Sequence, residues 1–463
     1  MKQYFTPLAC FADSARESTA LHLIAFDKFP AWLKSQPKNV REFLSSAAAH
    51  AKPGMIMRFT DDAARSFVAI YDNENLWDVA ACLQNLPPDH FMPAADTADE
   101  LWPLLVAAWG MHFYRFTAFK SDKENKMPVL VIPKARVKNL TPVLHYLRAV
   151  YLVRDLVNLP ASHLGPQELA DAATAVFEPL DAKITITRGA PLAKQYPAVH
   201  AVGTGSERPP LFMEINWGNA KHPRIAIVGK GVVFDTGGYD IKPSSNMLLM
   251  KKDMGGAAHA IGLGYLIITS KLPVQLQILL PIVENSISGH AMRPSDVINT
   301  RKGLTVEIGN TDAEGRLILA DALTRADEGN PEVIIDFATL TGAARAALGP
   351  DLPAFFCTDD RIARQIMDLS MNAYDPVWQL PLWQGYMDQM KGKVADINNT
   401  GRDSFAGAIY AALFLQKFVS PKRLWMHLDT FAWNASARPG RPDGGEALGL
   451  RTIYAWLRGK YGR

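Results

Sequence analysis

Apolar positions divide the chain into two regions of different character. In the first 140 residues, short apolar runs predict strands at 21–26, 67–71 and 128–132, and the proline- and acid-rich stretch 86–103 predicts a loop with a short helix. From residue 225 onward, apolar runs that predict strands alternate with runs of helical spacing. The predicted strands are 225–228, 276–280, 333–337 and 424–427, and the predicted helices are 257–269, 317–326 and 406–418. This alternation predicts an α/β sheet with helices on both faces.

A helix between the two regions marks the expected domain boundary. Thr141 and Pro142 are typical of a helix N-cap and first position, and apolar residues follow at helical spacing until Pro160. At 463 residues the chain exceeds what one core normally supports. We therefore expect two domains. A smaller N-terminal α/β domain (1–140) is joined by an interdomain helix (141–159) to a larger C-terminal α/β domain (160–463), which has a mixed sheet flanked by helices.

Composition and charge are those of an ordinary globular protein. Apolar residues make up 48% and charged residues 21%, and the net charge of +3 is too mild to argue for a nucleic-acid partner. Three scattered cysteines, Cys10, Cys82 and Cys357, form no metal-binding or disulfide pattern, which fits a reducing compartment. No apolar run is long enough to span a membrane, and the N-terminus lacks a signal-peptide pattern. We expect a cytoplasmic protein without membrane association.

The densest polar cluster lies where a predicted strand meets a predicted helix. Residues 310–317 read Asn-Thr-Asp-Ala-Glu-Gly-Arg-Leu, after an alternating apolar stretch and before a helical apolar run. One interpretation is purely structural, because Thr311 and Glu314 have the spacing of a capping box. The other is a functional site at a strand-to-helix junction. This segment alone does not decide between them.

A second polar cluster favours the functional interpretation. Four ionisable residues stand among glycines and apolar residues upstream, namely Lys230, Asp235, Lys242 and Asp253. Unpaired charges in such surroundings cost several kcal/mol, so something must compensate them. One or two divalent cations would do so, because bridging carboxylates suit paired metals, and the octapeptide adds two more carboxylates. A lysine could also act as a ligand, since buried lysines shift their pKa readily.

Two other site types are disfavoured by their motifs. Gly229-Lys-Gly231 follows a predicted strand, but the third glycine of a dinucleotide-binding fingerprint is missing, as is a P-loop. The eleven histidines include no His-Glu-x-x-His, which excludes that class of zinc site. We expect His259 and His290 to be structural.

Several segments together resemble a known enzyme family. The segments 228–242, 252–256 and 310–317 are similar to signature blocks of the leucyl (cytosol) aminopeptidases, a family of dinuclear metallopeptidases. Further similar segments are 154–160, 203–206, 336–342 and 425–429, so the resemblance covers roughly residues 150–455. It implies that 160–463 is a catalytic metallopeptidase domain with two divalent metal ions, Zn²⁺ or Mn²⁺, per chain.

The resemblance also implies a role for each charged residue. One metal would be held by Asp235, Asp312 and Glu314, and the other by Lys230, Asp235, Asp253 and Glu314. The two metals would share a water whose lowered pKa gives a hydroxide nucleophile. Lys242 would stabilise the oxyanion, and Arg316 would hold a bicarbonate ion that acts as general base. Asp240 stands where the family more often has serine, and on an extended segment it could pair with Lys242.

The function expected is that of a metal-dependent aminopeptidase that hydrolyses the N-terminal residue from short peptides. The resemblance further implies a homohexamer of paired trimers. An alternative of another class is a DNA-binding regulatory protein, as some relatives bind DNA. That function would need a basic face, and charges are nearly balanced in the first 150 residues, so a nucleic-acid partner is not expected. The intact ligand set disfavours an inactive homologue.

Overall fold

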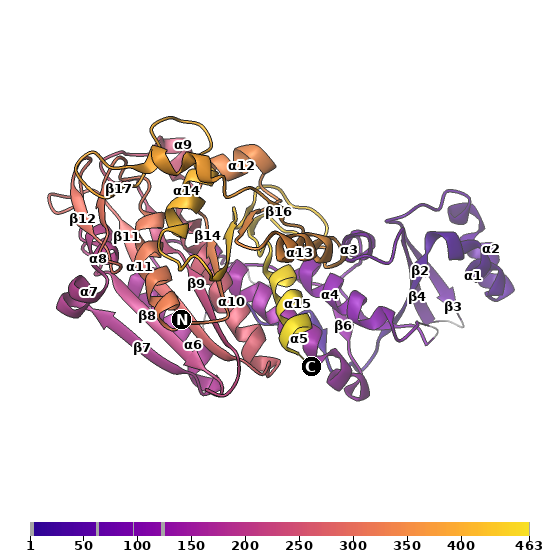
Figure 1. The fold of residues 1–463 in the computed structure, drawn as a ribbon. Helices are drawn as coiled ribbons and strands as arrows, with labels where there is room; N and C mark the ends of the chain where they lie inside the picture. Colours follow the sequence, from indigo (N-terminus) through magenta and orange to yellow (C-terminus); the bar gives the residue numbers. More distant parts are fainter. Residues whose placement is uncertain (1–3, 62–63, 96, 122–125, 463) are drawn as a thin grey trace. The chain divides into compact units, whose positions relative to one another are not determined.

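The computed structural model describes residues 4–61, 64–95, 97–121 and 126–462. The chain forms two compact units, and each has its own sheet (Figure 1). The smaller unit contains Tyr4–Tyr151 and Ala435–Asp443, and the larger one includes Leu152–Asn434 and Gly444–Arg463. The predicted two-domain α/β architecture is thus confirmed. Among the described helices, none combines the length and apolarity needed to cross a membrane.

The smaller unit is a six-stranded sheet in the order β1-β6-β5-β2-β4-β3, parallel except for the β3–β4 pair. Its elements are β1 (Phe11–Ala12), β2 (Thr19–Ala25), α1 (Phe29–Ser35), α2 (Lys38–Ala48), β3 (Ile56–Asp61), β4 (Ala64–Tyr71), α3 (Leu76–Leu83), β5 (His90–Pro93), α4 (Leu101–Phe113) and β6 (Val129–Val131). Strand β5 lies in the stretch predicted as loop and short helix. That prediction missed it because the strand is only four residues long and ends in a proline, although Phe91 and Pro93 are buried.

The segment Ala435–Asp443 joins the smaller unit although it is distant in sequence. The amide of Gly440 donates to His112 Nδ1 at 3.2 Å, and the Arg441 guanidinium lies 4.3 Å from the centre of the Trp77 ring. No pattern in the sequence predicts this return of the chain.

Helix α5 (Lys134–Asn158) carries the boundary between the units, which falls after Tyr151. The prediction that this helix begins at Thr141 was wrong. The Thr141 hydroxyl donates to the Val137 carbonyl at 3.0 Å inside the helix. Pro142 removes one backbone hydrogen bond, but the helix continues past it. Pro133, directly before the first helical residue, supplies the same proline start signal earlier in the chain.

The larger unit is built on a nine-stranded mixed sheet. Its central strands β18, β14, β9 and β11 run parallel, β8 and β15 pair antiparallel to them, and β10 pairs parallel with β11. The strands are β7 (Lys183–Arg188), β8 (Leu211–Trp217), β9 (Arg224–Gly229), β10 (Gly231–Asp235), β11 (Gln275–Asn285), β14 (Val333–Ala338), β15 (Ala354–Cys357), β16 (Trp378–Gln379) and β18 (Leu424–Asp429). Smaller sheets are formed by β12 (Val297–Asn299), β13 (Thr305–Glu307) and β17 (Ile397–Asn398), and by β19 (Trp433–Asn434) and β20 (Gly444–Gly445).

Helices cover both faces of the large sheet (Figure 1). They are α6 (Pro166–Phe177), α7 (Gly189–Gln195), α8 (Pro197–Gly203), α9 (Ser244–Met247), α10 (Gly255–Thr269), α11 (Gly315–Glu328), α12 (Gly342–Leu348), α13 (Asp360–Asn372), α14 (Gly407–Gln416) and α15 (Leu450–Tyr461). Helix α10 packs on β9 and β14 with α6 and α15, and α11 packs on β9 and β11 with α8 and α14. Strand β9 is buried on both sides, and its Ala226 and Val228 belong to the core around α11.

Candidate metal centre

The predicted site residues lie at the carboxyl ends of parallel strands. Lys230 follows β9, and Asp235 ends β10. Asp253 lies in the short 3-10 turn Met250–Met254 just before α10, and Glu314 directly precedes α11. In open α/β sheets, this edge is where ligands bind, because loops and helix starts converge there. The fold therefore brings together residues that are scattered over the sequence.

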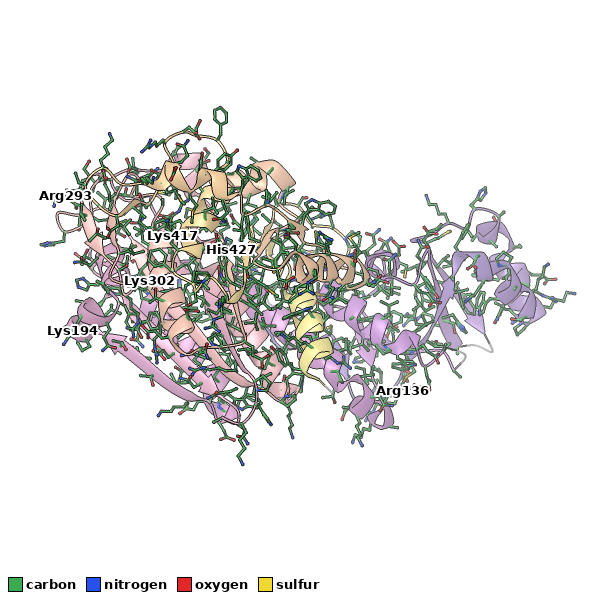
Figure 2. All side chains as sticks on the ribbon, in the orientation of Figure 1. Arg136, Lys194, Arg293, Lys302, Lys417 and His427 are labelled. Atoms are coloured by element: carbon green, nitrogen blue, oxygen red, sulfur yellow. The ribbon has the colours of Figure 1, made fainter. Side chains whose placement is uncertain are left out.

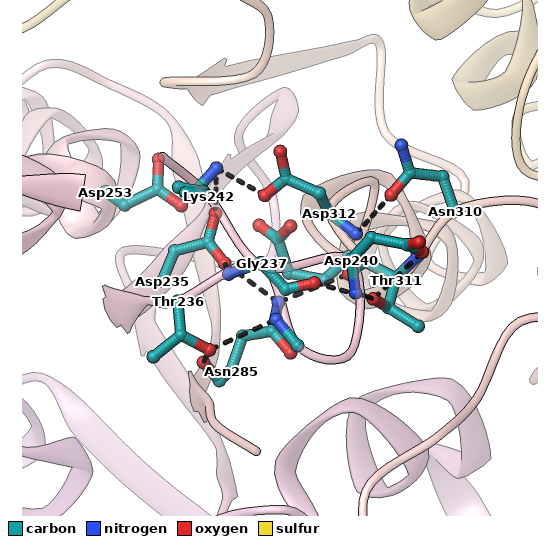
Figure 3. A network of polar contacts seen from close by, with 12 residues as sticks. Asp235, Thr236, Gly237, Asp240, Lys242, Asp253, Asn285, Asn310, Thr311 and Asp312 are labelled. Carbon is teal, nitrogen blue, oxygen red and sulfur yellow. Dashed lines mark hydrogen bonds and ion pairs between the residues drawn. The ribbon is translucent and has the colours of Figure 1, made fainter. Parts of the chain in front are cut away.

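Three carboxylates form the centre of the cluster. One oxygen from each of Asp235, Asp312 and Glu314 lies within 4.8 Å of the others, a spacing that can hold a metal ion. Asp235 and Glu314 are 2% and 1% exposed, and Asp312 is half-buried. Figure 3 shows Asp235 and Asp312 converging on the Lys242 ammonium. The carboxylates expected to ligate metal thus do lie together.

Two lysines lie between these carboxylates. The Lys230 ammonium is 2.8 Å from Asp253 Oδ2 and 2.9 Å from Glu314 Oε1, so it joins Asp253 to the three-carboxylate group. Lys242 pairs with Asp235 at 2.9 Å and also with Asp312. The paired oxygens of Asp253, Glu314 and Asp312 are buried and form no hydrogen bond of normal geometry with any described residue, so the ion pairs alone satisfy them. Such oxygens are suited to a more strongly bound cation.

The carboxyl pKa values reveal a shortage of positive charge. Burial, followed by repulsion from Asp235, raises the pKa of Glu314 to about 8 and that of Asp312 to about 6. Burial acts to lower the pKa of Lys230, but the charges of Asp253 and Glu314 outweigh it and raise this pKa. The half of the centre that contains Glu314 and Asp312 is therefore electrostatically strained without a further cation.

Thr311 does not form the capping box that offered a structural explanation for the octapeptide. Its hydroxyl donates to the Gly237 carbonyl at 2.6 Å and accepts from the Asp240 amide at 2.9 Å, and α11 has no side-chain cap. The suggested pairing of Asp240 with Lys242 was also wrong. Asp240 Oδ2 accepts from the Thr311 amide at 2.7 Å, and Lys242 turns to Asp235 and Asp312 instead. These hydrogen bonds connect residues 237–240 to Thr311 in the octapeptide 310–317 (Figure 3).

Two glycines make this arrangement possible. A Cβ atom at Gly315 would lie only 2.6 Å from Lys230 Nζ, so a larger residue would displace the amine from Glu314. Gly237 has a φ of +88°, and a Cβ atom there would lie 2.4 Å from the Asp240 carbonyl oxygen. The glycines around the charged residues thus allow close approach as well as tight turns.

Arg316 lies at the start of α11 and lines the same cavity, whose volume is about 450 Å³. Its Nη1 donates to the Asn399 carbonyl at 2.6 Å, whereas its buried Nε has no hydrogen-bond partner among the residues that the structure describes. Burial lowers the pKa of Arg316 to about 10, which leaves the guanidinium charged near neutral pH. A guanidinium with unused donors that faces a cavity can hold a small anion.

Several residues that support the centre were not assigned roles from the sequence. Thr339 Oγ1 donates to Asp253 Oδ1 at 2.7 Å, and the Thr339 carbonyl accepts from Lys230 Nζ at 3.2 Å. Asn285 Nδ2 donates to Asp235 Oδ1 at 2.8 Å. Thr339 belongs to one of the segments that carry the family resemblance, but only the folded chain reveals what its hydroxyl contacts.

The histidines examined from the sequence take no part in this centre. His259 Nδ1 donates to the Gly255 carbonyl at 2.7 Å, and its Nε2 accepts from the Leu448 amide at 3.0 Å. His290 is exposed. His427 lies inside the larger unit, fully buried, with its Nδ1 2.5 Å from Asp336 Oδ1 (Figure 2). The two hydrogen bonds that His259 forms with backbone groups indicate the structural role expected for it.

Comparisons with known proteins agree with this geometry. The catalytic-domain model of the cytosol aminopeptidase family matches residues 151–454, and the model of the M17 aminopeptidase N-terminal domain matches residues 19–133. A probable cytosol aminopeptidase from Shewanella oneidensis is 41% identical over 355 residues, which are 74% of this chain and 70% of that protein.

Two solved structures resemble the whole chain. The cytosol aminopeptidase of Coxiella burnetii has a TM-score of 0.92 at 42% identity and covers 98% of this chain and 99% of its own. The bottromycin maturation enzyme BotP in complex with Mn has a TM-score of 0.84 at 29% identity and covers 96% of this chain and 100% of its own. This chain therefore belongs to the cytosol aminopeptidase family and is a metal-dependent aminopeptidase, a hydrolase.

Proposed function

We propose that this enzyme removes the N-terminal residue from short peptides with two divalent metal ions, Zn²⁺ or Mn²⁺. The observation that carries the proposal is the group of three buried or half-buried carboxylates within 4.8 Å of one another, which Lys230 connects to Asp253. The ligands would be Lys230, Asp235, Asp253, Asp312 and Glu314, of which Asp235 and Glu314 would serve both ions. The structural relative BotP was solved in complex with Mn, which supports a divalent metal here.

The donor set fits hard or borderline divalent cations. Four carboxylates supply oxygen ligands, and the raised pKa values of Glu314 and Asp312 indicate where added positive charge would be most favourable. When bound, a pair of such ions activates water and polarises the scissile carbonyl as Lewis acids. Lys230 would have to bind as the neutral amine, and its ammonium occupies that position between Asp253 and Glu314 here.

Lys242 would stabilise the negative charge that develops on the carbonyl oxygen. Its ammonium has three N–H donors, and Asp235 and Asp312 engage two of them. The third is left for the substrate, and the side chain lines the cavity with 12% of its surface exposed. A preorganised donor of this kind is usually worth a few kcal/mol in the transition state.

Arg316 would hold a bicarbonate ion as the general base. Its position in the cavity wall, its single hydrogen bond to Asn399 and its unpaired Nε support an anion there. A planar guanidinium matches a planar carbonate-type anion through two parallel donors. The arginine would thus keep a proton acceptor beside acidic ligands that would otherwise repel it.

We further propose a homohexamer, in which access would be limited to short peptides. The family resemblance suggests it, and large apolar side chains at the surface of the larger unit support an interface; Leu248, Val394 and Phe405 are 79%, 74% and 76% exposed. Light scattering of active enzyme tests the assembly. A strictly monomeric active enzyme would contradict it.

The decisive experiment combines metal analysis with a panel of N-terminal aminoacyl amides. We expect two divalent ions per chain, loss of activity on chelation, and recovery with Zn²⁺, Mn²⁺ or Co²⁺. Glu314→Gln should lower the occupancy of both ions, because that carboxylate lies between the lysine and the other two carboxylates. Full activity in protein that elemental analysis shows to be free of divalent metal would refute the proposal.

A further inference from the structure

Two cations that line the catalytic cavity lie close to a single aromatic ring. Lys252, Arg345 and Phe431 all line the cavity that contains the metal centre. The Lys252 ammonium lies 5.1 Å from the centre of the Phe431 ring, and the Arg345 guanidinium carbon lies 4.6 Å from it. The three side chains come from the turn before α10, from α12 and from the segment after β18. A cluster of positive charge therefore adjoins the predicted metal ligands.

Lys252 is the unusual member, because a buried lysine normally has a full set of partners. The side chain is only 6% exposed. Among the described residues, its one ion pair is with Asp253 Oδ1 at 4.0 Å, the outer limit of such a contact, and that oxygen already accepts from Thr339. The ammonium also makes a cation–π contact with the face of the Phe431 ring. The ammonium thus retains donors that face the cavity.

The neighbouring Lys251 illustrates what a satisfied lysine looks like here. Its Nζ donates to the Asn158 carbonyl at 2.7 Å and lies 5.4 Å from the centre of the Trp433 ring. It does not line the cavity. Two adjacent lysines therefore have different environments, and only Lys252 is directed at the space where substrate must bind.

Arg345 adds a permanent charge at the same end of the cavity. It is exposed on α12, and within the described chain its recorded contact is with the Phe431 ring. The nearby Asp429 does not neutralise this end by direct pairing. Its Oδ1 accepts from the amides of Leu340 and Thr341, and its Oδ2 accepts from the Thr341 hydroxyl. Both carboxylate oxygens are thus occupied at the start of α12.

We infer that Lys252 and Arg345 bind the side-chain carboxylate of an N-terminal glutamate or aspartate, so that acidic residues are preferred substrates. This inference rests on the proposed aminopeptidase function. If the substrate's α-amino group is held at the metal beside Asp253, the side chain of the same residue starts close to Lys252, whose ammonium is 4.0 Å from Asp253. A carboxylate there would meet two cationic groups with unused donors.

Two other binding modes are open to this cavity. The same cations could bind the C-terminal carboxylate of a dipeptide, or the apolar lining could bind an apolar side chain of the first residue. Leu249, Met250 and Leu352 also line the cavity and would suit a leucyl or methionyl side chain. The position of Lys252 next to Asp253 favours the side chain of the first residue, because a C-terminal carboxylate lies beyond the scissile bond. The substrates below separate these three possibilities.

The test compares substrates that differ only in charge. The metal-loaded enzyme is assayed with para-nitroanilides of glutamate, glutamine and leucine, which have no C-terminal carboxylate. We expect kcat/KM for the glutamyl substrate to exceed that for the glutaminyl substrate by roughly tenfold or more, as a charge-assisted contact provides. Equal values, or a preference for glutaminyl or leucyl substrates, would overturn the inference while leaving the aminopeptidase function intact. Failure to cleave any amide would refute the proposed function itself.

Variants then assign the effect to the two cations. Lys252→Met and Arg345→Gln should each lower the glutamyl-to-glutaminyl ratio by about tenfold, whereas Lys251→Met, which removes the same charge one residue away, should leave the ratio unchanged. Arg345 is exposed, so its variant remains informative if the buried position does not tolerate change. The dipeptide Leu-Gly and its amide complete the set. If Lys252→Met lowers the ratio of Leu-Gly to Leu-Gly amide and spares the glutamyl ratio, the carboxylate is C-terminal and the side-chain inference is wrong.

Discussion

Replacing Thr339 with valine should weaken metal binding without touching any proposed ligand. The Thr339 hydroxyl donates to Asp253 Oδ1 at 2.7 Å, and both residues are buried. Valine keeps the shape of threonine and removes only the donor. Asp253 would then lose the bond that fixes its orientation toward Lys230, with which its other oxygen pairs at 2.8 Å. The hydrogen bond from the Lys230 ammonium to the Thr339 backbone carbonyl would remain.

The expected magnitude follows from the kind of bond that is lost. A hydrogen bond to a charged group contributes about 1.5–3 kcal/mol, and about 1.4 kcal/mol corresponds to a factor of ten in a binding constant. We therefore expect the dissociation constant of the metal held by Asp253 to rise by roughly 10–100-fold, the usual effect of losing a hydrogen bond to a metal ligand. The metal that Asp312 would hold should be affected less, because within the described chain the Thr339 hydroxyl bonds to Asp253 and not to Asp312.

Titration of metal-free protein with Mn²⁺ or Zn²⁺ against a competing chelator measures this change. Thr324→Val serves as the matched control, because Thr324 is also buried and its hydroxyl donates to the Ala320 carbonyl at 2.8 Å within α11, with no contact to the site. Both variants should lose some thermal stability, and only Thr339→Val should lose metal affinity. If the two variants bind metal equally well, the hydroxyl does not support the centre and the reasoning fails.

Three further outcomes are expected. Lys242→Met should lower kcat by roughly 10²–10³-fold with near-normal metal content, the usual loss for one oxyanion donor; full turnover would remove Lys242 from the mechanism. Arg316→Ala should slow turnover and abolish any stimulation by added bicarbonate, and equal stimulation of both proteins would argue against an anion at that position. Burial lowers the pKa of His112 from 6.5 to about 4, so the neutral ring stabilises the fold above pH 6.5, and this contribution is lost as the pH falls toward 4. His112→Asn should flatten the pH dependence of chemical unfolding in that range, and an unchanged profile would assign the dependence to other groups.

The sequence predicted the elements of the larger unit because their patterns are long and local. The runs 225–228, 276–280, 333–337 and 424–427 correspond to β9, β11, β14 and β18, and three predicted helices correspond to α10, α11 and α14. Central parallel strands are buried on both faces and therefore appear as continuous apolar runs. In the smaller unit, strand β5 has only four residues, too few to outweigh the prolines around it.

The candidate ligands were predictable, but their supporting contacts were not. Charges set among glycines and apolar residues make Asp235, Asp253 and Glu314 candidates, and the family resemblance of these short segments implies their ligand roles. The hydrogen bonds that orient them join residues far apart in the chain. Thr339 and Asp253 are separated by 86 positions, and Asn285 and Asp235 by 50. The parallel pairing of β9 with β14 places Lys230 and Thr339 directly after neighbouring strands, and the parallel pairing of β10 with β11 places Asp235 opposite Asn285.

The same distinction separates the reaction from its specificity. Metal ligation requires particular residue types in fixed geometry, so its residues cluster in segments that resemble one family closely. The end of the cavity near Phe431 is built from three separate segments, and no ligand geometry constrains it. Lys252 directly precedes a proposed metal ligand, yet its side chain lies over the ring of Phe431, a residue far away in the sequence. Changes at such positions can alter the preferred substrate and leave the metal centre intact. Charge at positions 252 and 345 is therefore the feature to compare among related enzymes when their substrate preferences are measured.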